Sequence, residues 1–285
     1  LEDVLPEVLP AGADAGALTP AGAALLDASG TLEPGIPFCP PEGDAATGMV
    51  ATNAVHPRSG SISAGTSGFV MLVLEKPLAG WYPEIDLVAT PSGRPVAMAH
   101  CNTCTSEIDA WAGLFSELLR RNGCEISLGE LYAQLYSAAL EGAPDAGGMA
   151  AFNYFAGEPL SATEHGRPML VRLPDSRLTL PNFMRAQLYG ALATLRMGVD
   201  LLREQEGVAL ERLLGHGGFF KTPRAGLQIL ADVFGVPAAQ LETAGEGGPW
   251  GMALLAAYRA SHAPDETLEQ YLTRAFQTAP CETLK

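Results

Sequence analysis

The stretch Ser61-Ile-Ser-Ala-Gly-Thr-Ser-Gly-Phe-Val-Met-Leu-Val-Leu74 decides the fold of this chain. Small and hydroxyl residues lead into Gly65-Thr-Ser-Gly68, and an apolar run follows from Phe69. This pattern predicts a strand, a tight turn and a second strand, both strands buried. Glycines flanking a Thr-Ser pair let the backbone approach a ligand and can aim amides and hydroxyls at one anion, such as a terminal phosphate. An ordinary β-hairpin has the same pattern, so the motif alone leaves both interpretations open.

The composition is that of a globular protein with a strong acidic excess. The 285 residues suffice for one large or two modest domains. A formal charge of -15, with 17 Lys and Arg against 32 Asp and Glu, argues against a nucleic-acid or acidic-membrane surface. An anion bound by this chain must therefore be held mainly by backbone amides, helix N-termini and a metal ion rather than by Lys and Arg side chains.

Cysteine usage favours a reducing compartment. The five cysteines are odd in number and scattered, which does not suit a disulfide framework, so the cytoplasm is the expected location. His100-Cys-Asn-Thr-Cys104 contains one Cys-x-x-Cys, but no second Cys/His pair stands at metal-site spacing, and no protein-built metal cage is predicted. No apolar run approaches the roughly 20 residues of a membrane span, and no signal-peptide pattern opens the sequence.

The region before Ser61 is rich in Pro, Gly and Ala. Thr19–Leu26 predicts a short helix with a Thr N-cap and a Pro in the first turn. Gly35–Cys39 predicts a short strand, and Ala45–Val55 a helix of small residues. Asp44 would then lie at a strand-to-helix junction, where ligands of open α/β sheets collect. A plain helix N-cap is the ordinary alternative for this aspartate.

Further elements follow from hydrophobic periodicity and capping signals. Strands are predicted at Pro95–Ala99, Phe152–Phe155 and Met169–Leu173, and helices at Ser106–Leu119, Ser127–Leu140, Asn182–Arg203, Ala225–Phe234 and Met252–Ser261. Ser127-Leu-Gly-Glu130 is a capping-box pattern. The long apolar helix Asn182–Arg203 could pack inside the domain or against a second subunit of a homodimer, and the domain core is the commoner use.

Three glycine-rich turns each meet a regular element, at Gly65, at Gly215–Gly218 and at Gly245–Gly251. A helix N-terminus behind a glycine turn is a ready site for an anion or a nucleotide. Three such turns beside a carboxylate favour a nucleotide-dependent phosphotransferase over an unspecialised α/β domain. None of them is a Walker loop or a Gly-x-Gly-x-x-Gly dinucleotide motif.

Four ordered segments resemble the FGGY carbohydrate kinases. Glu42-Gly-Asp-Ala-Ala46 is similar to the family's Gly-Asp-x-Ala segment, and Ser63-Ala-Gly-Thr-Ser-Gly68 to its interdomain phosphate turn. Gly217-Gly218 through Gln228-Ile-Leu-Ala-Asp232 resembles the GG…Q-x-x-AD segment. Glu246 through Gly251-Met-Ala-Leu-Leu-Ala256 resembles the E…GAA-x-x-A helix start. The order and separations of all four agree.

The resemblance implies an α/β fold of the ribonuclease H-like, actin-like ATPase type, with a mixed sheet flanked by helices. A full member has two such domains with the active site between them. Residues 1–58 look like the end of the first domain, carrying Asp44, and residues 59–285 like the C-terminal, nucleotide-side domain. Because the chain opens on Leu1 and lacks the first domain's Asp-x-Gly-Thr turn, we expect it to be part of a longer polypeptide.

The resemblance also implies a role for individual residues. Asp44 looks like the catalytic base that contacts the sugar, and Phe69 like a wall of the sugar site. The phosphates of ATP would be held by one turn and the adenosine by another, with Mg²⁺ travelling with ATP rather than sitting in a protein cage. The residues concerned are Gly65, Thr66 and Ser67 for phosphate, and Gly217, Gly218 and Thr222 for adenosine.

Three positions depart from the family pattern. Tyr189 stands where the usual Arg-Ala-x-Leu-Glu-Gly helix has glutamate. Gly157-Glu-Pro159 only loosely echoes the Gly-Glu-Arg-x-Pro element, and Phe219-Phe220 places bulk beside the second glycine turn.

The sequence therefore predicts an ATP-dependent sugar kinase of the ribulokinase/xylulokinase-like group, represented by its C-terminal portion and inactive alone. A ketopentose, xylulose or ribulose, is the expected acceptor. Alternative acceptors are glycerol, a hexulose and gluconate. A degenerate homologue that binds a ligand without catalysis, and a purely structural α/β domain, are the alternatives from other classes.

Overall fold

A computed structural model describes residues 4, 6–245 and 247–285. The main sheet has seven strands in the order β3-β4-β2-β1-β7-β8-β9. Their bounds are β1 Ser59–Ala64, β2 Gly68–Val73, β3 Asp86–Ala89, β4 Pro95–Cys101, β7 Arg212–His216, β8 Ala238–Leu241 and β9 Cys281–Leu284. Two further strands, β5 Met149–Phe152 and β6 Met169–Arg172, form a separate antiparallel pair.

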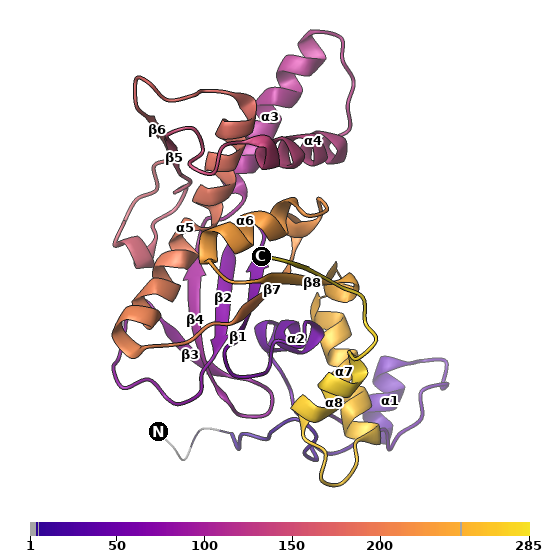
Figure 1. Cartoon of the computed structure of the whole chain (residues 1–285). Helices are drawn as coiled ribbons and strands as arrows, with labels where there is room; N and C mark the ends of the chain where they lie inside the picture. Colours follow the sequence, from indigo (N-terminus) through magenta and orange to yellow (C-terminus); the bar gives the residue numbers. More distant parts are fainter. Residues whose placement is uncertain (1–3, 5, 246) are drawn as a thin grey trace.

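Helices cover both faces of the sheet and build a lobe beyond one end of it (Figure 1). They are α1 Pro20–Leu26, α2 Asp44–Ala51, α3 Ser106–Arg121, α4 Leu128–Glu141, α5 Leu180–Glu206, α6 Ala225–Phe234, α7 Gly247–Ser261 and α8 Leu268–Ala275. Short 3-10 turns are η2 Pro159–Ser161, η3 Gly218–Phe220 and η4 Glu242–Gly245. The predicted mixed sheet flanked by helices is confirmed. No helix of the described residues combines the length and the apolar character that a membrane crossing requires.

The sheet is antiparallel on one side and parallel in its middle. β1 and β2 form the predicted hairpin, with Ala64 paired to Gly68 at its closed end. β2 continues into antiparallel pairing with β4. On the other side β1 runs parallel to β7, and β7 parallel to β8. The carboxyl ends of β1 and β7 therefore reach the same edge, although about 150 residues of sequence separate the two strands.

Alternate residues of the hairpin enter two different cores. Ile62, Val70 and Leu72 are buried with residues of α5 and α6 on one face. Met71 and Val73 are buried on the other face with residues of α2, α7 and α8. This strict alternation of buried side chains is the period-2 pattern of a strand covered on both faces.

Helix starts follow the capping signals of the sequence. The Thr19 hydroxyl accepts a hydrogen bond from the Gly22 amide at 3.0 Å, which caps α1. Ser127 and Glu130 form the predicted capping box at α4. Such a cap accepts hydrogen bonds from amides that the helix itself leaves unpaired, and it stabilises the fold by about 1 kcal/mol.

The long helix α5 is buried within the domain. It packs against β4, where Gly198 lies against Ala99, and against the β5–β6 pair, where Gly190 lies against the carbonyl of Ala151. Close approach of this kind requires glycine because any Cβ would overlap the neighbour. The apolar face of α5 is used in the core, as the sequence favoured.

Several predicted elements differ from the structure. Gly35–Cys39 is not a strand of the sheet, because Pro37 makes an isolated bridge with Ala17 and no ladder extends from it. Asp44 therefore follows a loop rather than a strand. The strand expected at Phe152–Phe155 is β5, three residues earlier. The central strands β7 and β8, the edge strands β3 and β9, and helix α8 were not predicted. Edge strands are short and carry little hydrophobic pattern, which explains why the sequence did not reveal them.

Candidate active site

The turn Gly65–Ser67 is tied down through its carbonyl groups. Within the turn the Gly65 amide donates to the Ser67 carbonyl at 3.0 Å. The carbonyl of Gly65 accepts from the Thr105 amide at 2.9 Å, and that of Thr66 from the Cys104 amide at 2.8 Å. The Cys104-Thr105 segment, which precedes α3, therefore holds the backbone of the turn on the side away from solvent.

The other side of the turn faces outward. Thr66 and Ser67 are exposed. Across the described residues, neither of their amides forms a hydrogen bond with the protein. Two backbone N–H groups and two hydroxyls on one turn are the donor set that a phosphate group takes.

The Cys101–Cys104 pair fills the space behind the same turn. A Cβ added to Gly68 would lie 3.3 Å from the Cys101 Sγ and 3.3 Å from the Cys104 Cβ. Both cysteines are buried free thiols. The pKa of the Cys104 thiol is raised, mainly by a hydrogen bond with Cys101 and also by burial. Because the thiolate is the reactive form, Cys104 behaves as a packing residue.

The second glycine turn lies directly against the end of β1. Gly217 follows β7 with φ 104°, in a region that side-chain-bearing residues rarely adopt. A Cβ at this position would lie 2.7 Å from the carbonyl oxygen of Ala64. In the parallel pairing Ser63 lies opposite His216, so the Gly65–Ser67 turn and Gly217-Gly218 leave the sheet side by side. The fold brings these predicted phosphate and adenosine residues together.

Replacing Gly217 by alanine is therefore expected to destabilise the chain by about 2 kcal/mol, because it adds both backbone strain and overlap with Ala64. A Cβ at Gly218 would meet nothing within 4 Å, so Gly218→Ala is the matched control. Chemical denaturation of the two variants measures the difference. If the two variants were equally stable, the close approach of Gly217 to β1 would not contribute to the stability of the fold.

The bulky Phe219-Phe220 pair points away from the surface of the second turn. Both rings are buried, at 0% and 2% exposure. Phe220 lies against Gly215 and Phe219 packs edge-on to Tyr136, with ring centroids 5.6 Å apart. The two rings fill the core beneath the turn, and Thr222 follows them partly buried.

Asp44 is the first residue of α2, and Gly43 rather than Asp44 is the N-cap. Its exposed carboxylate accepts a hydrogen bond from the Ala45 amide at 2.8 Å. The helix is held by α7, whose Gly251 packs against the carbonyl of Thr47. Of the third glycine segment, Glu246 lies outside the described residues, and α7 begins at Gly247 rather than at Met252.

Phe69 and His216 lie between α2 and the sheet. Phe69 is partly buried against the core that contains α2, and its ring meets the His216 ring edge-on at a centroid distance of 6.4 Å. A Cβ on Gly48 of α2 would lie 3.4 Å from the His216 Nε2. Sequence reasoning assigned His216 no role; the signal was a polar residue at the end of an apolar strand, just before the glycines.

Acidification is expected to destabilise the chain through His216. Burial lowers the pKa of His216 below 6.5, and its Nε2 has no partner in the described structure. Below pH 6.5 the unfolded chain takes up a proton that the folded chain does not, so stability falls with pH by up to about 1.4 kcal/mol per unit of pKa difference. In unfolding titrations between pH 7.5 and 5, His216→Phe should flatten this dependence and the exposed His165→Gln should not. An unchanged pH slope in His216→Phe would refute the assignment.

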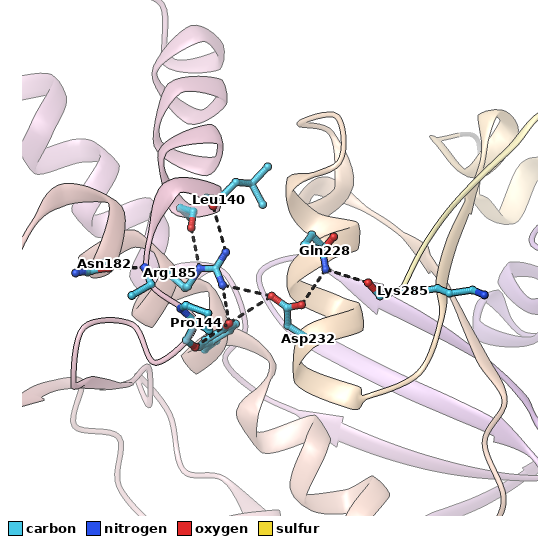
Figure 2. Close-up of polar contacts among 10 residues, drawn as sticks. Leu140, Pro144, Asn182, Arg185, Gln228, Asp232 and Lys285 are labelled. Carbon is cyan, nitrogen blue, oxygen red and sulfur yellow. Dashed lines mark hydrogen bonds and ion pairs between the residues drawn. The ribbon is translucent and has the colours of Figure 1, made fainter.

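A polar cluster connects α4, α5 and α6 with Lys285, which follows β9 (Figure 2). The buried Arg185 donates through Nε to the Ala139 carbonyl at 2.9 Å, at the end of α4. Its NH1 group reaches the hydroxyl of Tyr189 at 3.1 Å and the carboxylate of Asp232 at 3.4 Å. Gln228 Nε2 donates to Asp232 Oδ1 at 2.8 Å.

This cluster explains how Tyr189 replaces the glutamate of the family pattern. Its hydroxyl donates to Asp232 Oδ2 at 3.4 Å, so Asp232 supplies the negative charge beside Arg185. The phenol of Tyr189 joins these hydrogen bonds without placing a second carboxylate beside Asp232. Gln228 also donates to the carbonyl of Lys285 at 3.4 Å, which joins the end of the chain to α6.

The chemistry available at this edge of the sheet is that of anion binding. The donors come from the backbone and from the hydroxyls of Thr66 and Ser67. Asp44 begins α2, and α2 approaches the end of β7 through Gly48, which lies against His216. In the part of the chain that the structure describes, no three His, Cys, Asp or Glu side chains gather closely enough to hold a metal ion. A divalent cation at the site would rely on phosphate and water ligands, which suits Mg²⁺.

Comparison with known proteins places this geometry in a family. Residues 60–260 match the family model described as "FGGY family of carbohydrate kinases, C-terminal domain". The chain belongs to the FGGY family of carbohydrate kinases. A xylulose kinase of Haemophilus influenzae is 26% identical over 242 residues, covering 82% of this chain and 43% of that protein.

Solved structures of a xylulose kinase and a glycerol kinase share the fold. A xylulose kinase from Rhodospirillum rubrum has a TM-score of 0.75 at 22% identity, covering 99% of this chain and 52% of that one. A Plasmodium falciparum glycerol kinase has a TM-score of 0.68 at 15% identity, covering 96% and 51%. At these identities the likeness shows the fold alone. The chain spans about half the length of these matched proteins.

Proposed function

We propose that this chain is the nucleotide-side half of an ATP-dependent sugar kinase that phosphorylates a ketopentose, xylulose or ribulose. One observation carries the proposal: the fold sets two glycine turns side by side at the ends of parallel β1 and β7, next to the helix that begins with Asp44. The similarity to a xylulose kinase supports a ketopentose as the acceptor.

In the proposed reaction Asp44 accepts the proton of a sugar hydroxyl as that oxygen bonds to the γ-phosphorus. The bond between the γ-phosphorus and the bridging oxygen breaks, and ADP leaves with the electron pair. The amides and hydroxyls of Thr66 and Ser67, with Gly65, stabilise charge on the transferred phosphoryl group. Mg²⁺ bound to ATP would supply the charge that neutralises the phosphates.

The remaining site residues bind rather than react. Phe69 forms a wall of the sugar site at the start of β2, where its ring is partly buried beside α2. Gly217 and Gly218 line the adenosine site because their backbone has no side chain to keep a ligand away. Thr222 borders that site. The cytoplasm, where ATP is abundant, is the proposed location.

A substrate panel tests the proposal. A polypeptide that joins this chain to a first domain of the kind the proposed kinase requires is assayed for ADP release with xylulose, ribulose, glycerol, a hexulose and gluconate. A ketopentose is expected to give the highest kcat/KM, and this chain alone is expected to give negligible turnover, because the proposed active site needs residues from both domains. ADP release with none of the acceptors by a folded polypeptide would contradict a kinase function.

A further inference from the structure

Glu158 is a fully buried carboxylate in the lobe beyond the sheet, at 0% exposure. It lies in the loop between β5 and η2, within Gly157-Glu-Pro159. Burying a carboxylate is costly unless hydrogen bonds replace its water. A fold that retains one in its interior must provide donors for both oxygens.

Both oxygens of Glu158 accept hydrogen bonds from one short backbone segment. Oε2 accepts from the Asn102 amide at 2.9 Å, and Oε1 accepts from the Thr103 amide at 2.7 Å. Bonds to an ionised carboxylate are stronger than those between neutral groups. The segment that leaves β4 is thus held in one conformation by a side chain from a distant loop.

The next two amides of this segment hold the phosphate turn. Cys104 and Thr105 donate to the carbonyls of Thr66 and Gly65 at 2.8 and 2.9 Å. Four successive amides, from residue 102 to residue 105, therefore link Glu158 to the turn. The buried Asn153 secures the same segment, because its Nδ2 donates to the Cys104 carbonyl at 2.6 Å.

We propose that Glu158 is a positioning residue that orders the phosphate turn for the terminal phosphate of a nucleoside triphosphate. The proposal rests on the proposed function of the turn. With its carbonyls fixed from behind, the turn keeps the amides of Thr66 and Ser67 facing outward before ligand arrives. Donors fixed in advance need no reorganisation when charge arrives, and this preorganisation is the source of their electrostatic effect.

A role in folding alone makes a different prediction. If Glu158 only joined the lobe to β4, its loss would weaken binding of the diphosphate and the triphosphate equally. Because the turn contacts the terminal phosphate, a positioning role predicts loss that is selective for the triphosphate.

Glu158→Gln tests the proposal in the whole chain, with the exposed Glu164→Gln as control. The glutamine keeps one acceptor but turns an NH₂ group toward the other amide, which loses one charge-assisted hydrogen bond. Affinity for the Mg²⁺ complex of the β,γ-imido analogue of ATP should fall about tenfold. Affinity for Mg-ADP should stay within about twofold, a difference too small to reflect a lost hydrogen bond. Equal loss of the two ligands, or no loss, would overturn the proposal.

Amide hydrogen exchange gives a readout that does not depend on nucleotide binding. In Glu158→Gln the amides of Cys104 and Thr105 should exchange about tenfold faster, because the segment that presents them is released. Unchanged exchange there would overturn the positioning role. If the wild-type chain bound neither nucleotide, the proposed nucleotide site would fail, while the exchange result would still decide whether Glu158 orders the turn. Should the glutamine variant not fold, Glu158→Asp, which keeps the charge, is expected to show both effects in weaker form.

Discussion

Gly251→Ala is expected to destabilise the chain by about 3 kcal/mol, the upper part of the range for overpacked interiors. The Cβ of alanine would overlap the carbonyl of Thr47, a backbone atom in the middle of α2 that cannot rotate away. α7 would have to move off α2, and α2 carries Asp44. Thermal unfolding should show a fall in Tm of about 6 °C.

Gly113→Ala is the matched control for this substitution. Gly113 lies on the exposed side of α3, and a Cβ there would meet nothing within 4 Å. Alanine is a better helix former than glycine, so this variant should gain about 0.5–1 kcal/mol. If Gly251→Ala were as stable as Gly113→Ala, the packing of α7 on α2 would not be the contact that holds the start of α2.

Asp44→Asn is expected to lower kcat for sugar phosphorylation by about 10²–10⁴-fold, the usual contribution of a general base. The assay uses the polypeptide that joins this chain to the first domain. Affinity for Mg-ADP should not change, because the amide keeps the shape of the side chain and Asp44 does not hold the nucleotide. The substitution removes the proton acceptor and leaves the helix start intact.

Asp86→Asn, on the exposed edge strand β3, controls for a general effect of losing one negative charge. It should leave kcat unchanged. If Asp44→Asn also left the rate of the protein unchanged, Asp44 would not be the base. A homologue that acts by binding rather than by catalysis would then be the better account.

Local signals in the sequence were enough to predict the hairpin and several helix starts. The hairpin 61–74 combines a turn motif with an apolar run, and both are properties of neighbouring residues. The Thr19 cap and the Ser127 capping box are equally local, since each depends on residues three positions apart. These elements could be predicted because the residues that form the turn or the cap are the same neighbouring residues that make the sequence motif.

The arrangement of the site required the tertiary fold. Nothing near residue 65 or residue 217 shows that β1 pairs with β7, and this long-range pairing sets the two glycine turns side by side. The burial of His216 depends on α2, which comes from a different part of the chain. Glu158 was quoted only as a loose echo of a family element, because its partners, Asn102 and Thr103, lie 55 or more residues away.

The false strand at Gly35–Cys39 has a physical explanation. Three prolines, at positions 34, 37 and 40, and Gly35 surround one isoleucine and one phenylalanine, and both of those apolar side chains are about half exposed. Such a segment has the extended geometry of a strand but buries too little to join a sheet, and proline removes ladder donors. Extended backbone and a strand of the sheet cannot be distinguished from this pattern alone.

Calorimetric titration of the chain with Mg-ADP and with the Mg²⁺ complex of the β,γ-imido analogue of ATP tests the central claim most directly. The wild-type chain and Thr66→Val, which loses one hydroxyl and keeps the side-chain shape, are compared. The account predicts saturable binding of both nucleotides by the wild type, and a selective loss of the triphosphate analogue, about tenfold, in Thr66→Val. Two results would contradict a nucleotide half-site built on these two turns. One is the absence of saturable binding by the folded wild-type chain. The other is that Thr66→Val binds the triphosphate analogue as tightly as the wild type does.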